Sequence, residues 1–196
     1  ILDTVDSIND LKSQNLKKYF CVSTDKAANP ANLMGASKRI MEIFLARESN
    51  FVNISTARFA NVAFSDGSLL YGFKKRIEKN QPLSAPKDIK RYFISQKDAG
   101  CLCLLSTILG ENNDIFFPKL DMAKDLISFT DIAVNYVTSM GFKPHICETE
   151  EEARRVGRDL IDKKLWPLYF FDSDTSGEKD SEIFWSDNDE LVLDRY

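Results

Sequence analysis

Along the first third of the chain, the spacing of hydrophobic residues alternates between a helical pattern and a strand-like pattern. Apolar residues recur at helical spacing over residues 1–17, whereas Lys18–Val22 forms a short strand-like run. Asn32 can cap a second helix that continues to about Glu48, and the β-rich run FVNISTARF starts at Phe51. The order helix, strand, helix, strand predicts a parallel sheet covered by helices.

Ligands of such sheets bind beyond the carboxyl ends of the strands. The segment Thr24–Lys26 follows the first expected strand, and Asn61–Ser68 follows the second. We therefore expect both segments at the same edge of the sheet.

The pattern becomes mixed in the rest of the chain. A helix is expected after Ser68 to near Asn80, and two more over Gln96–Leu109 and over Thr130–Met140, the last one stopped by Gly141. The run QPLSAP suggests a short edge strand or loop, and IFFPKL suggests a strand. The stretch that begins KPHICETEEEARR predicts a strand, a helix and an aromatic segment, so a small appended α/β lobe is expected.

Composition and charge exclude several classes of protein. The 196 residues carry a net charge of −4, with a mildly basic body and an acidic tail, so a nucleic-acid partner is not expected. The 4 cysteines lack metal-type spacing, which predicts no metal site and favours a reducing cytoplasm. No apolar run approaches the roughly 20 residues that span a bilayer, so no membrane segment is expected in this chain.

Candidate functional side chains gather near the end of the first expected strand, from the strand end itself and from the helix that follows. Met34 and Lys38 are four residues apart on the expected second helix, so they share one face close to Thr24, Asp25 and Lys26. Taken alone, an acid and an amine at a strand end form a solvated turn more often than a proton-handling pair. Met34 alone would be core filler, and Lys38 alone a surface residue.

Three longer motifs resemble one known family. They are VSTDKAANPANLMGASKR, ARFANVAFSDGSLLYGFKKRIEKNQPLS followed by IKRYFIS, and WPLYFFDSDTSGEKDSEIF. The chain resembles the carboxyl-terminal part of an extended short-chain dehydrogenase/reductase, specifically a UDP-N-acetylglucosamine 4,6-dehydratase of the bacterial polysaccharide-biosynthesis group, in the branch associated with legionaminic acid.

The resemblance implies a Rossmann-like doubly wound parallel sheet whose amino-terminal half, with the glycine-rich loop for NAD, is not in this sequence. Residues 1–80 would then be the carboxyl-terminal half of the NAD-binding domain. Residues 81–196 would form a substrate-binding lobe and carboxyl-terminal extension, partly interleaved with that domain. The chain alone is expected to bind NAD weakly.

The resemblance also implies the chemistry. NAD takes a hydride from C4 of the sugar, water is eliminated across C5 and C6, and the hydride returns to C6. Asp25 matches the acid that protonates the leaving hydroxyl, Lys26 the base that removes the C5 proton, and Thr24 the group that hydrogen-bonds the C4 oxygen. Lys26 can act as a base only if burial or a nearby cation such as Lys38 favours the neutral amine. Lys38 and Met34 match the cofactor-binding positions.

Met34 departs from the commoner pattern, in which a Tyr accepts the proton from the C4 hydroxyl. One branch of the family shares this Met, and Thr24, Asp25 or a water relay are the alternative acceptors. The UDP-sugar would be bound by Asn61 and Arg91, with Ser68 as a weaker candidate. Arg91 has a structural alternative, which is to pair with the acidic tail.

Two alternatives to a dehydratase stay open. One is a sugar-nucleotide 4-epimerase of the same superfamily, although epimerases keep Tyr at the position of Met34. The other is a non-catalytic oligomerisation unit. The resemblance also implies a homodimer or a larger homo-oligomer, because the first two expected helices lie where this superfamily forms its dimer, and they carry apolar residues beyond one stripe.

Overall fold

A computed structural model describes residues 17–121, 124–173 and 182–194 of the protein. The expected helix over residues 1–17 lies almost entirely outside the described residues. The elements, in chain order, are β1 (Lys18–Thr24), the short 3-10 helix η1 (Asp25–Ala27), α2 (Leu33–Glu48), β2 (Asn53–Phe59), β3 (Asn61–Val62), α3 (Leu69–Glu78), β4 (Leu83–Pro86), β5 (Lys90–Ile94), α4 (Gln96–Leu109), β6 (Ile115–Phe116), β7 (Leu126–Ser128), α5 (Phe129–Ser139), β8 (Lys143–Cys147), α6 (Glu150–Asp162) and β9 (Leu165–Phe171).

The chain forms two compact units that alternate along the sequence. The first unit takes the described residues up to Val62, those from Ile94 to Leu120, and those from Glu182 onward. The second unit takes 63–93 and the described residues of 121–176. The division into an NAD-binding part, 1–80, and a substrate lobe, 81–196, stays a prediction about function.

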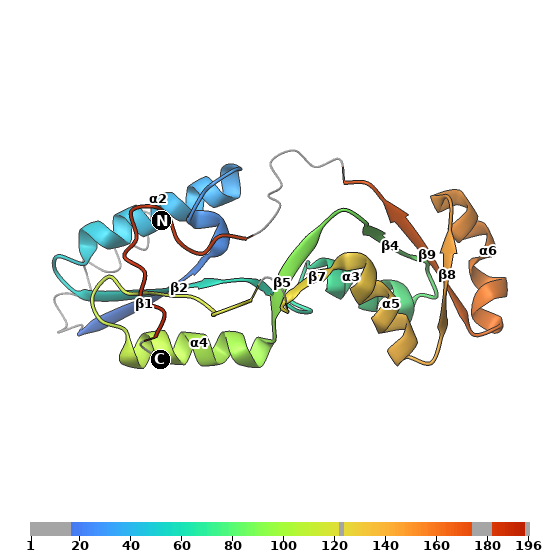
Figure 1. Ribbon diagram of the computed structural model, residues 1–196. Helices are drawn as coiled ribbons and strands as arrows, with labels where there is room; N and C mark the ends of the chain where they lie inside the picture. The colour runs from blue at the N-terminus through green and yellow to red at the C-terminus, as the bar shows by residue number, and fades with distance from the viewer. Residues whose placement is uncertain (1–16, 122–123, 174–181, 195–196) are drawn as a thin grey trace. The chain divides into compact units, whose positions relative to one another are not determined.

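The first unit contains the parallel sheet that the sequence predicts. β1 pairs with β2 along its whole length, from Lys18 opposite Asn53 to Thr24 opposite Phe59, and β6 pairs with the other edge of β2. Helices α2 and α4 cover opposite faces of this sheet (Figure 1). The expectation of an α/β fold with helices on both faces of a parallel sheet is confirmed.

Helix α4 contacts β2 through small polar side chains. The Ser55 hydroxyl donates to the Ser106 carbonyl at 2.7 Å, and the Ser106 hydroxyl donates to the Thr56 carbonyl at 3.2 Å. A side chain at Gly110 would put its Cβ 2.8 Å from the Ser55 Cβ, so the end of α4 requires glycine. Small polar residues thus replace large apolar ones where this helix meets the sheet.

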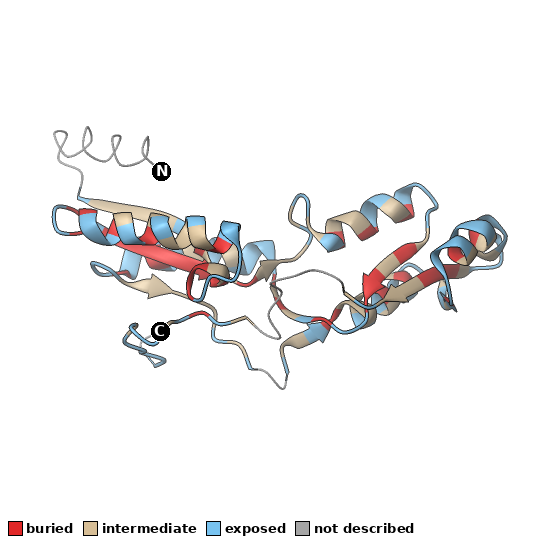
Figure 2. Ribbon diagram, turned by 90° about the horizontal axis from the view of Figure 1, so that it is seen from above, coloured by how far each residue is buried: buried red, intermediate tan, exposed pale blue. Residues whose placement is uncertain are grey.

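The second unit is built around β9. Strands β4 and β8 pair with β9 in parallel on its two edges, and α6 packs against β9. Helices α3 and α5 contribute to the main apolar core, whose buried members appear red in Figure 2. Its residues are Leu70, Phe73, Ile77, Leu83, Ala85, Ala133, Val137, Trp166 and Leu168.

Most expected elements appear at the expected places. α2 and α4 have the predicted bounds, and QPLSAP forms the edge strand β4. Gly141 follows α5 with a φ of +83°, a left-handed conformation that favours glycine. Two differences are β6, which ends at Phe116 because the chain soon reaches Pro118, and β7, which the sequence did not predict. β7 has only three residues and pairs with β5 in antiparallel fashion.

Candidate active site

The first strand end forms a tight polar turn. Thr24 is the last residue of β1 and caps η1, because the Lys26 amide donates to the Thr24 hydroxyl oxygen at 3.4 Å. Thr24 lies opposite Phe59, the last residue of β2, so the two strands end at one edge of the sheet. This is the edge where parallel sheets bind ligands.

Asp25 and Lys26 form an ion pair at this turn. Lys26 Nζ lies 3.3 Å from Asp25 Oδ1, and the Thr24 hydroxyl donates to the same oxygen at 2.7 Å. Asp25 is 4% exposed, whereas the side chain of Lys26 is 37% exposed. The carboxylate is thus held by two donors, and the amine keeps one side open to a ligand.

The start of α2 packs directly against η1. Asn32 caps the helix by accepting the Gly35 amide at 2.9 Å. A Cβ at Gly35 would lie 2.7 Å from the Lys26 carbonyl oxygen, so any other residue would push the helix away from the turn. The sequence signal of this contact is the glycine between Met34 and Lys38.

Met34 and Lys38 lie on α2 near this turn. Met34 is 52% exposed, so it is not core filler. Lys38 is partly exposed, and within the described residues no hydrogen bond or ion pair holds its ammonium group. Burial raises the pKa of the Cys21 thiol on β1, and the positive charge of Lys38 opposes that rise. Lys38 therefore lies within electrostatic reach of β1.

The three expected substrate-binding residues have different surroundings. Asn61 lies in β3, just beyond the end of β2, and its amide donates to the carboxylate of Glu182. Ser68 caps α3 by accepting the Tyr71 amide at 3.2 Å, which gives it a structural role. Arg91 lies in β5 opposite Ile127 and donates to the Lys90 carbonyl at 2.7 Å. Asn61 belongs to the first unit, and Ser68 and Arg91 belong to the second.

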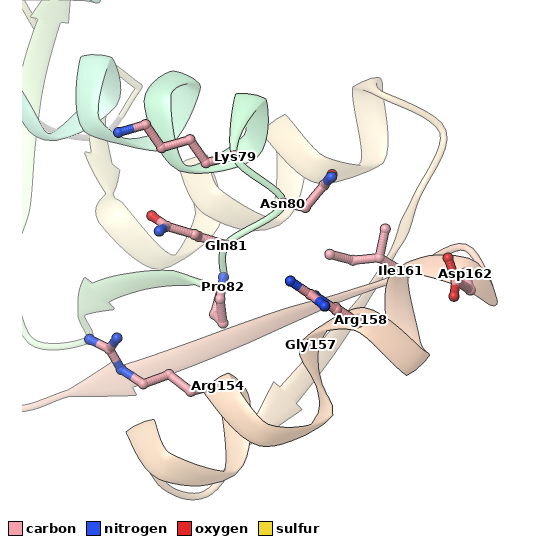
Figure 3. A pocket seen from close by; sticks show the side chains of 9 residues that line it. All are labelled: Lys79, Asn80, Gln81, Pro82, Arg154, Gly157, Arg158, Ile161 and Asp162. Atoms are coloured by element: carbon pink, nitrogen blue, oxygen red, sulfur yellow. The ribbon is translucent and has the colours of Figure 1, made fainter.

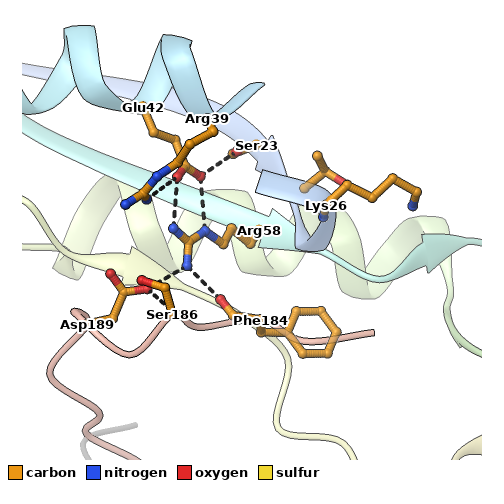
Figure 4. Close-up of polar contacts among 9 residues, drawn as sticks. Ser23, Lys26, Arg39, Glu42, Arg58, Phe184, Ser186 and Asp189 are labelled. Carbon is orange, nitrogen blue, oxygen red and sulfur yellow. Dashed lines mark hydrogen bonds and ion pairs between the residues drawn. The ribbon is translucent and has the colours of Figure 1, made fainter. Parts of the chain in front are cut away.

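Sequence reasoning missed a buried ionic network around Arg58, shown in Figure 4. Arg58 lies in β2 with its side chain 1% exposed, and donates to both carboxylate oxygens of Glu42 on α2 at 3.0 and 2.8 Å. It also donates to Asp189 Oδ2 at 2.8 Å and to the Phe184 carbonyl at 2.7 Å. The Ser23 hydroxyl donates to Glu42 at 2.6 Å.

This network ties four segments together: the end of β1, helix α2, strand β2 and the carboxyl-terminal segment, residues 182–194. Burial raises the pKa of Asp189, but the hydrogen bonds from Arg58 and from the Ser186 amide outweigh it and hold the pKa below its usual value. A signal for the network exists in the sequence. Arg58 shares a strand face with Ile54, and Glu42 lies one helical turn before Leu45, so both charges fall on core-facing positions.

Metal ligation has no support among the residues that the structure describes, where no group of three or more His, Cys, Asp or Glu could hold an ion. Nor is any helix in the described ranges long and apolar enough to cross a membrane.

The family can now be assigned from sequence comparison. The family described as polysaccharide biosynthesis protein matches residues 1–165. The chain belongs to this family. A member of similar sequence is the capsular polysaccharide biosynthesis protein CapD of Staphylococcus aureus, which is 32% identical over 84% of this chain and 28% of its own length.

Other relatives of this polysaccharide-biosynthesis chain include named enzymes. An inverting UDP-N-acetylglucosamine 4,6-dehydratase of Campylobacter jejuni is 34% identical over 60% of this chain and 36% of its own length. A UDP-glucose 4-epimerase of Rickettsia rickettsii is 30% identical over 61% of the chain and 37% of its own length. The chain therefore spans about a third of these curated relatives.

Solved structures confirm the fold. Pen from Bacillus thuringiensis superimposes with a TM-score of 0.69 at 20% identity, over 91% of this chain and 50% of that chain. The dTDP-glucose 4,6-dehydratase DesIV from Streptomyces venezuelae, solved with NAD bound, gives a TM-score of 0.64 at 12% identity, over 93% of this chain and 55% of its own. The expected Rossmann-like fold is thus confirmed for this family member.

Proposed function

We propose that the protein containing this chain dehydrates a UDP-N-acetyl-hexosamine, UDP-N-acetylglucosamine, to a 4-keto-6-deoxy sugar nucleotide for a bacterial surface polysaccharide or nonulosonic acid. The observation that carries the proposal is the Thr24–Asp25–Lys26 cluster at the carboxyl end of β1, in which the Thr24 hydroxyl and the half-exposed Lys26 amine both contact Oδ1 of the buried Asp25. The similarity to 4,6-dehydratases supports the reaction class.

An ion pair favours the charged forms of both groups, so elimination requires a proton to move within the pair first. Transfer of one proton from Lys26 Nζ to Asp25 Oδ1, across their 3.3 Å contact, leaves a neutral acid and a neutral amine. The acid protonates the leaving C6 hydroxyl, and the amine takes the C5 proton. After the step, Asp25 is a carboxylate and Lys26 an ammonium group, so the starting ion pair is restored. Thr24 would turn its hydroxyl from Asp25 to the C4 oxygen of the sugar.

The residues of α2 fit a nicotinamide cofactor. When bound, NAD would accept a hydride from C4 and return one to C6. Lys38 would hold the nicotinamide ribose. Its ammonium group suits this role because it forms no hydrogen bond or ion pair with any described residue. Met34 would cover the cofactor without exchanging a proton, since a thioether has none to give. The proton of the C4 hydroxyl would then pass to Thr24, Asp25 or water.

Product analysis of the full-length protein tests this function. We expect UDP-N-acetylglucosamine to lose its C6 hydroxyl, to gain solvent deuterium at C5 in deuterated water, and to leave NAD unchanged overall. Accumulation of NADH in step with product would contradict the proposal. Formation of the C4 epimer alone would support the 4-epimerase, and no conversion would support the non-catalytic unit.

Substitutions separate the acid and base from binding. Asp25→Asn and Lys26→Ala should each lower kcat by a factor of roughly 10²–10⁴, the usual contribution of a general acid or base, with little change in UDP-sugar affinity. Lys97→Ala is the matched control, because Lys97 is an exposed lysine of the same unit. A variant of Asp25 or Lys26 with the wild-type rate would remove that residue from the mechanism.

We also propose that the protein self-associates through α2. Leu33, Ile40 and Ile43 are exposed apolar residues of this helix. Their replacement by polar residues should shift the mass in light scattering at micromolar concentration from a dimer or larger assembly towards a monomer. A monomeric wild-type protein would contradict the proposal.

A further inference from the structure

The second unit has a basic pocket that is lined by none of the candidate catalytic, cofactor-binding or substrate-binding residues. Its volume is about 620 Å³, within the 300–1,000 Å³ range typical of small-molecule sites. One wall is the turn Lys79–Pro82 that follows α3, and the other is α6, with Arg154, Gly157 and Arg158 (Figure 3).

The turn that forms the first wall is fixed by its backbone. Asn80 has a φ of +53°, which turns the chain sharply after α3. The Gln81 amide donates to the Arg76 carbonyl at 2.8 Å, and Arg76 Nη1 donates to the Pro82 carbonyl at 3.2 Å. The polar side chains of this wall therefore project from a turn whose backbone is fixed by hydrogen bonds.

The opposite wall is open because of Gly157. This residue is buried on α6, and the nearest atom to a Cβ placed there would be Pro82 Cγ at 3.9 Å. A large side chain at this position would fill the gap between α6 and the turn. Arg158, the next residue, extends from α6 towards the turn at Asn80 and Pro82 (Figure 3).

The charges that line the pocket are unbalanced. Lys79, Arg154 and Arg158 border it, whereas Asp162 is its one acidic lining residue. Arg154 pairs with Glu150, which does not line the pocket. Among the described residues, no side chain pairs with Lys79 or Arg158. Cations that share a concave site repel one another, and a bound anion removes that repulsion.

A merely solvated face fits these facts less well. The protein carries a net charge of −4, and a helix surface that only needs solvent would distribute acids and bases together. Of the charged residues of α6, Arg154 and Arg158 line the pocket with Asp162 as the one acid, whereas the acids Glu150, Glu151, Glu152 and Asp159 do not line it. Positive charge is thus concentrated at the concave part of the surface.

We propose that this pocket binds the diphosphate group of a small molecule. The planar guanidinium of Arg158 suits two phosphate oxygens at once, and Lys79 supplies a second point charge. The side-chain amides of Asn80 and Gln81 offer further donors on the opposite wall. The inference goes beyond the proposed function, because Asp25, Lys26 and Arg91 do not line the pocket.

Titration of the wild-type protein with pyrophosphate, UDP and ADP tests the proposal. Binding is followed by isothermal calorimetry and by the amide NMR signals of Gly157 and Gln81. We expect all three ligands to bind with dissociation constants below 1 mM (~0.1–1 mM, the strength of about two charge-assisted bonds) and to shift these signals. Equal affinities identify the diphosphate alone as the ligand, whereas tighter binding of UDP or ADP identifies a nucleotide.

Three variants of α6 are expected to change the affinity for pyrophosphate in three different ways. Arg158→Gln should weaken pyrophosphate binding about tenfold, the loss expected for one charge-assisted contact. Arg155→Gln removes the neighbouring exposed arginine, which does not line the pocket, and should change the affinity less than about twofold. Asp162→Asn removes the one acid and should tighten binding by about two- to fivefold.

Two outcomes overturn the proposal. The first is the absence of pyrophosphate binding at 10 mM (~10 times the weakest dissociation constant expected). The second is equal weakening by Arg158→Gln and Arg155→Gln, which shows a diffuse surface charge and no site. Neither outcome bears on dehydration, which is measured separately by the product and by the Asp25 and Lys26 variants.

Discussion

The two units stabilise their interiors by different means. Within the described residues, buried polar and charged side chains are concentrated in the first unit, and the second unit has Ser128. Those of the first unit are Ser23, Asp25, Glu42, Glu48, Ser49, Ser55, Thr56, Arg58 and Ser106. The second unit has the larger apolar core, whereas the corresponding cluster of the first unit comprises Leu45, Val52 and Ile54.

The positions of neighbouring elements are fixed by buried polar contacts in the first unit. A buried ion pair contributes little net stability after desolvation, but it allows few alternative arrangements of its partners. Arg58 and Glu42 join β2 to α2, the helix that carries Met34 and Lys38. The hydrogen-bonded interior of the first unit thus holds the candidate active site in place, while apolar burial supplies stability in the second.

The largest expected effect comes from breaking the network in the first unit. Arg58→Met leaves the buried carboxylate of Glu42 without its main partner, which typically costs about 3–5 kcal/mol. Denaturant unfolding followed by hydrogen exchange of β1 and β2 measures this loss. Arg39→Met is the control, because Arg39 pairs with the same carboxylate at 3.3 Å from a more exposed position, and should cost less than about 1 kcal/mol. Equal costs would show that burial of Arg58 is not what matters.

The corresponding test in the second unit is a substitution that creates a cavity in its apolar core. Leu168 is 0% exposed in the centre of β9, and Leu168→Ala should cost about 3 kcal/mol, from lost burial and the cavity left behind. Leu168→Met nearly conserves volume and should cost less than about 1.5 kcal/mol. If both changes are equally costly, the core of the second unit depends on detailed shape, and the contrast between the units weakens.

The sequence predicts most of the fold because the elements are local. Asn32 before α2, Ser68 before α3 and Gly141 after α5 are capping or stop signals that act within one turn of the chain. β7 gave no such signal, since three residues are too few to show a period. The strand ends near Thr24 and Asn61 followed from the alternation of helices and strands.

The candidate site is predictable only in part. The adjacency of Thr24, Asp25 and Lys26 is a fact of sequence, and the structure adds the burial of Asp25 and the contact of Gly35 with the turn. The Arg58 network depends on Asp189, which is 131 residues away in the chain. No local pattern pairs two such residues. The catalytic roles of Thr24, Asp25 and Lys26 stay predictions, and so do the substrate-binding roles of Asn61, Ser68 and Arg91.

A smaller, pH-dependent effect is expected at Asp189. Its pKa is held below the unfolded value of about 3.9, so its stabilisation is present above that pH and is lost as the pH falls through the lowered pKa. Asp189→Asn should therefore cost about 1 kcal/mol at pH 7, and the difference from wild type should shrink below about pH 4 and disappear once the pH has fallen through the lowered pKa. Asp187→Asn, at an exposed neighbour, is the control and should change stability little at either pH. A difference at Asp189 that persists in acid would mean that the charge is not involved.

The smallest effect on stability is expected at Arg91, which makes it the counterpart of Arg58. Both are arginines within strands, but Arg91 lies in the second unit, partly exposed in β5 beside the basic residue Lys90. We predict that it binds the diphosphate of the UDP-sugar. Arg91→Lys keeps the charge and discards the planar fork, so affinity for UDP-N-acetylglucosamine should fall about tenfold or more.

The free energy of unfolding of Arg91→Lys should change by less than about 0.5 kcal/mol, as for a surface substitution. Calorimetric binding and thermal unfolding of the same sample measure the two quantities together. An Arg91→Lys protein that melts much earlier and binds the UDP-sugar with unchanged affinity would make Arg91 a structural residue like Arg58. In that case, ionic contacts would hold both units, and the contrast in how their interiors are stabilised would no longer separate scaffold from site.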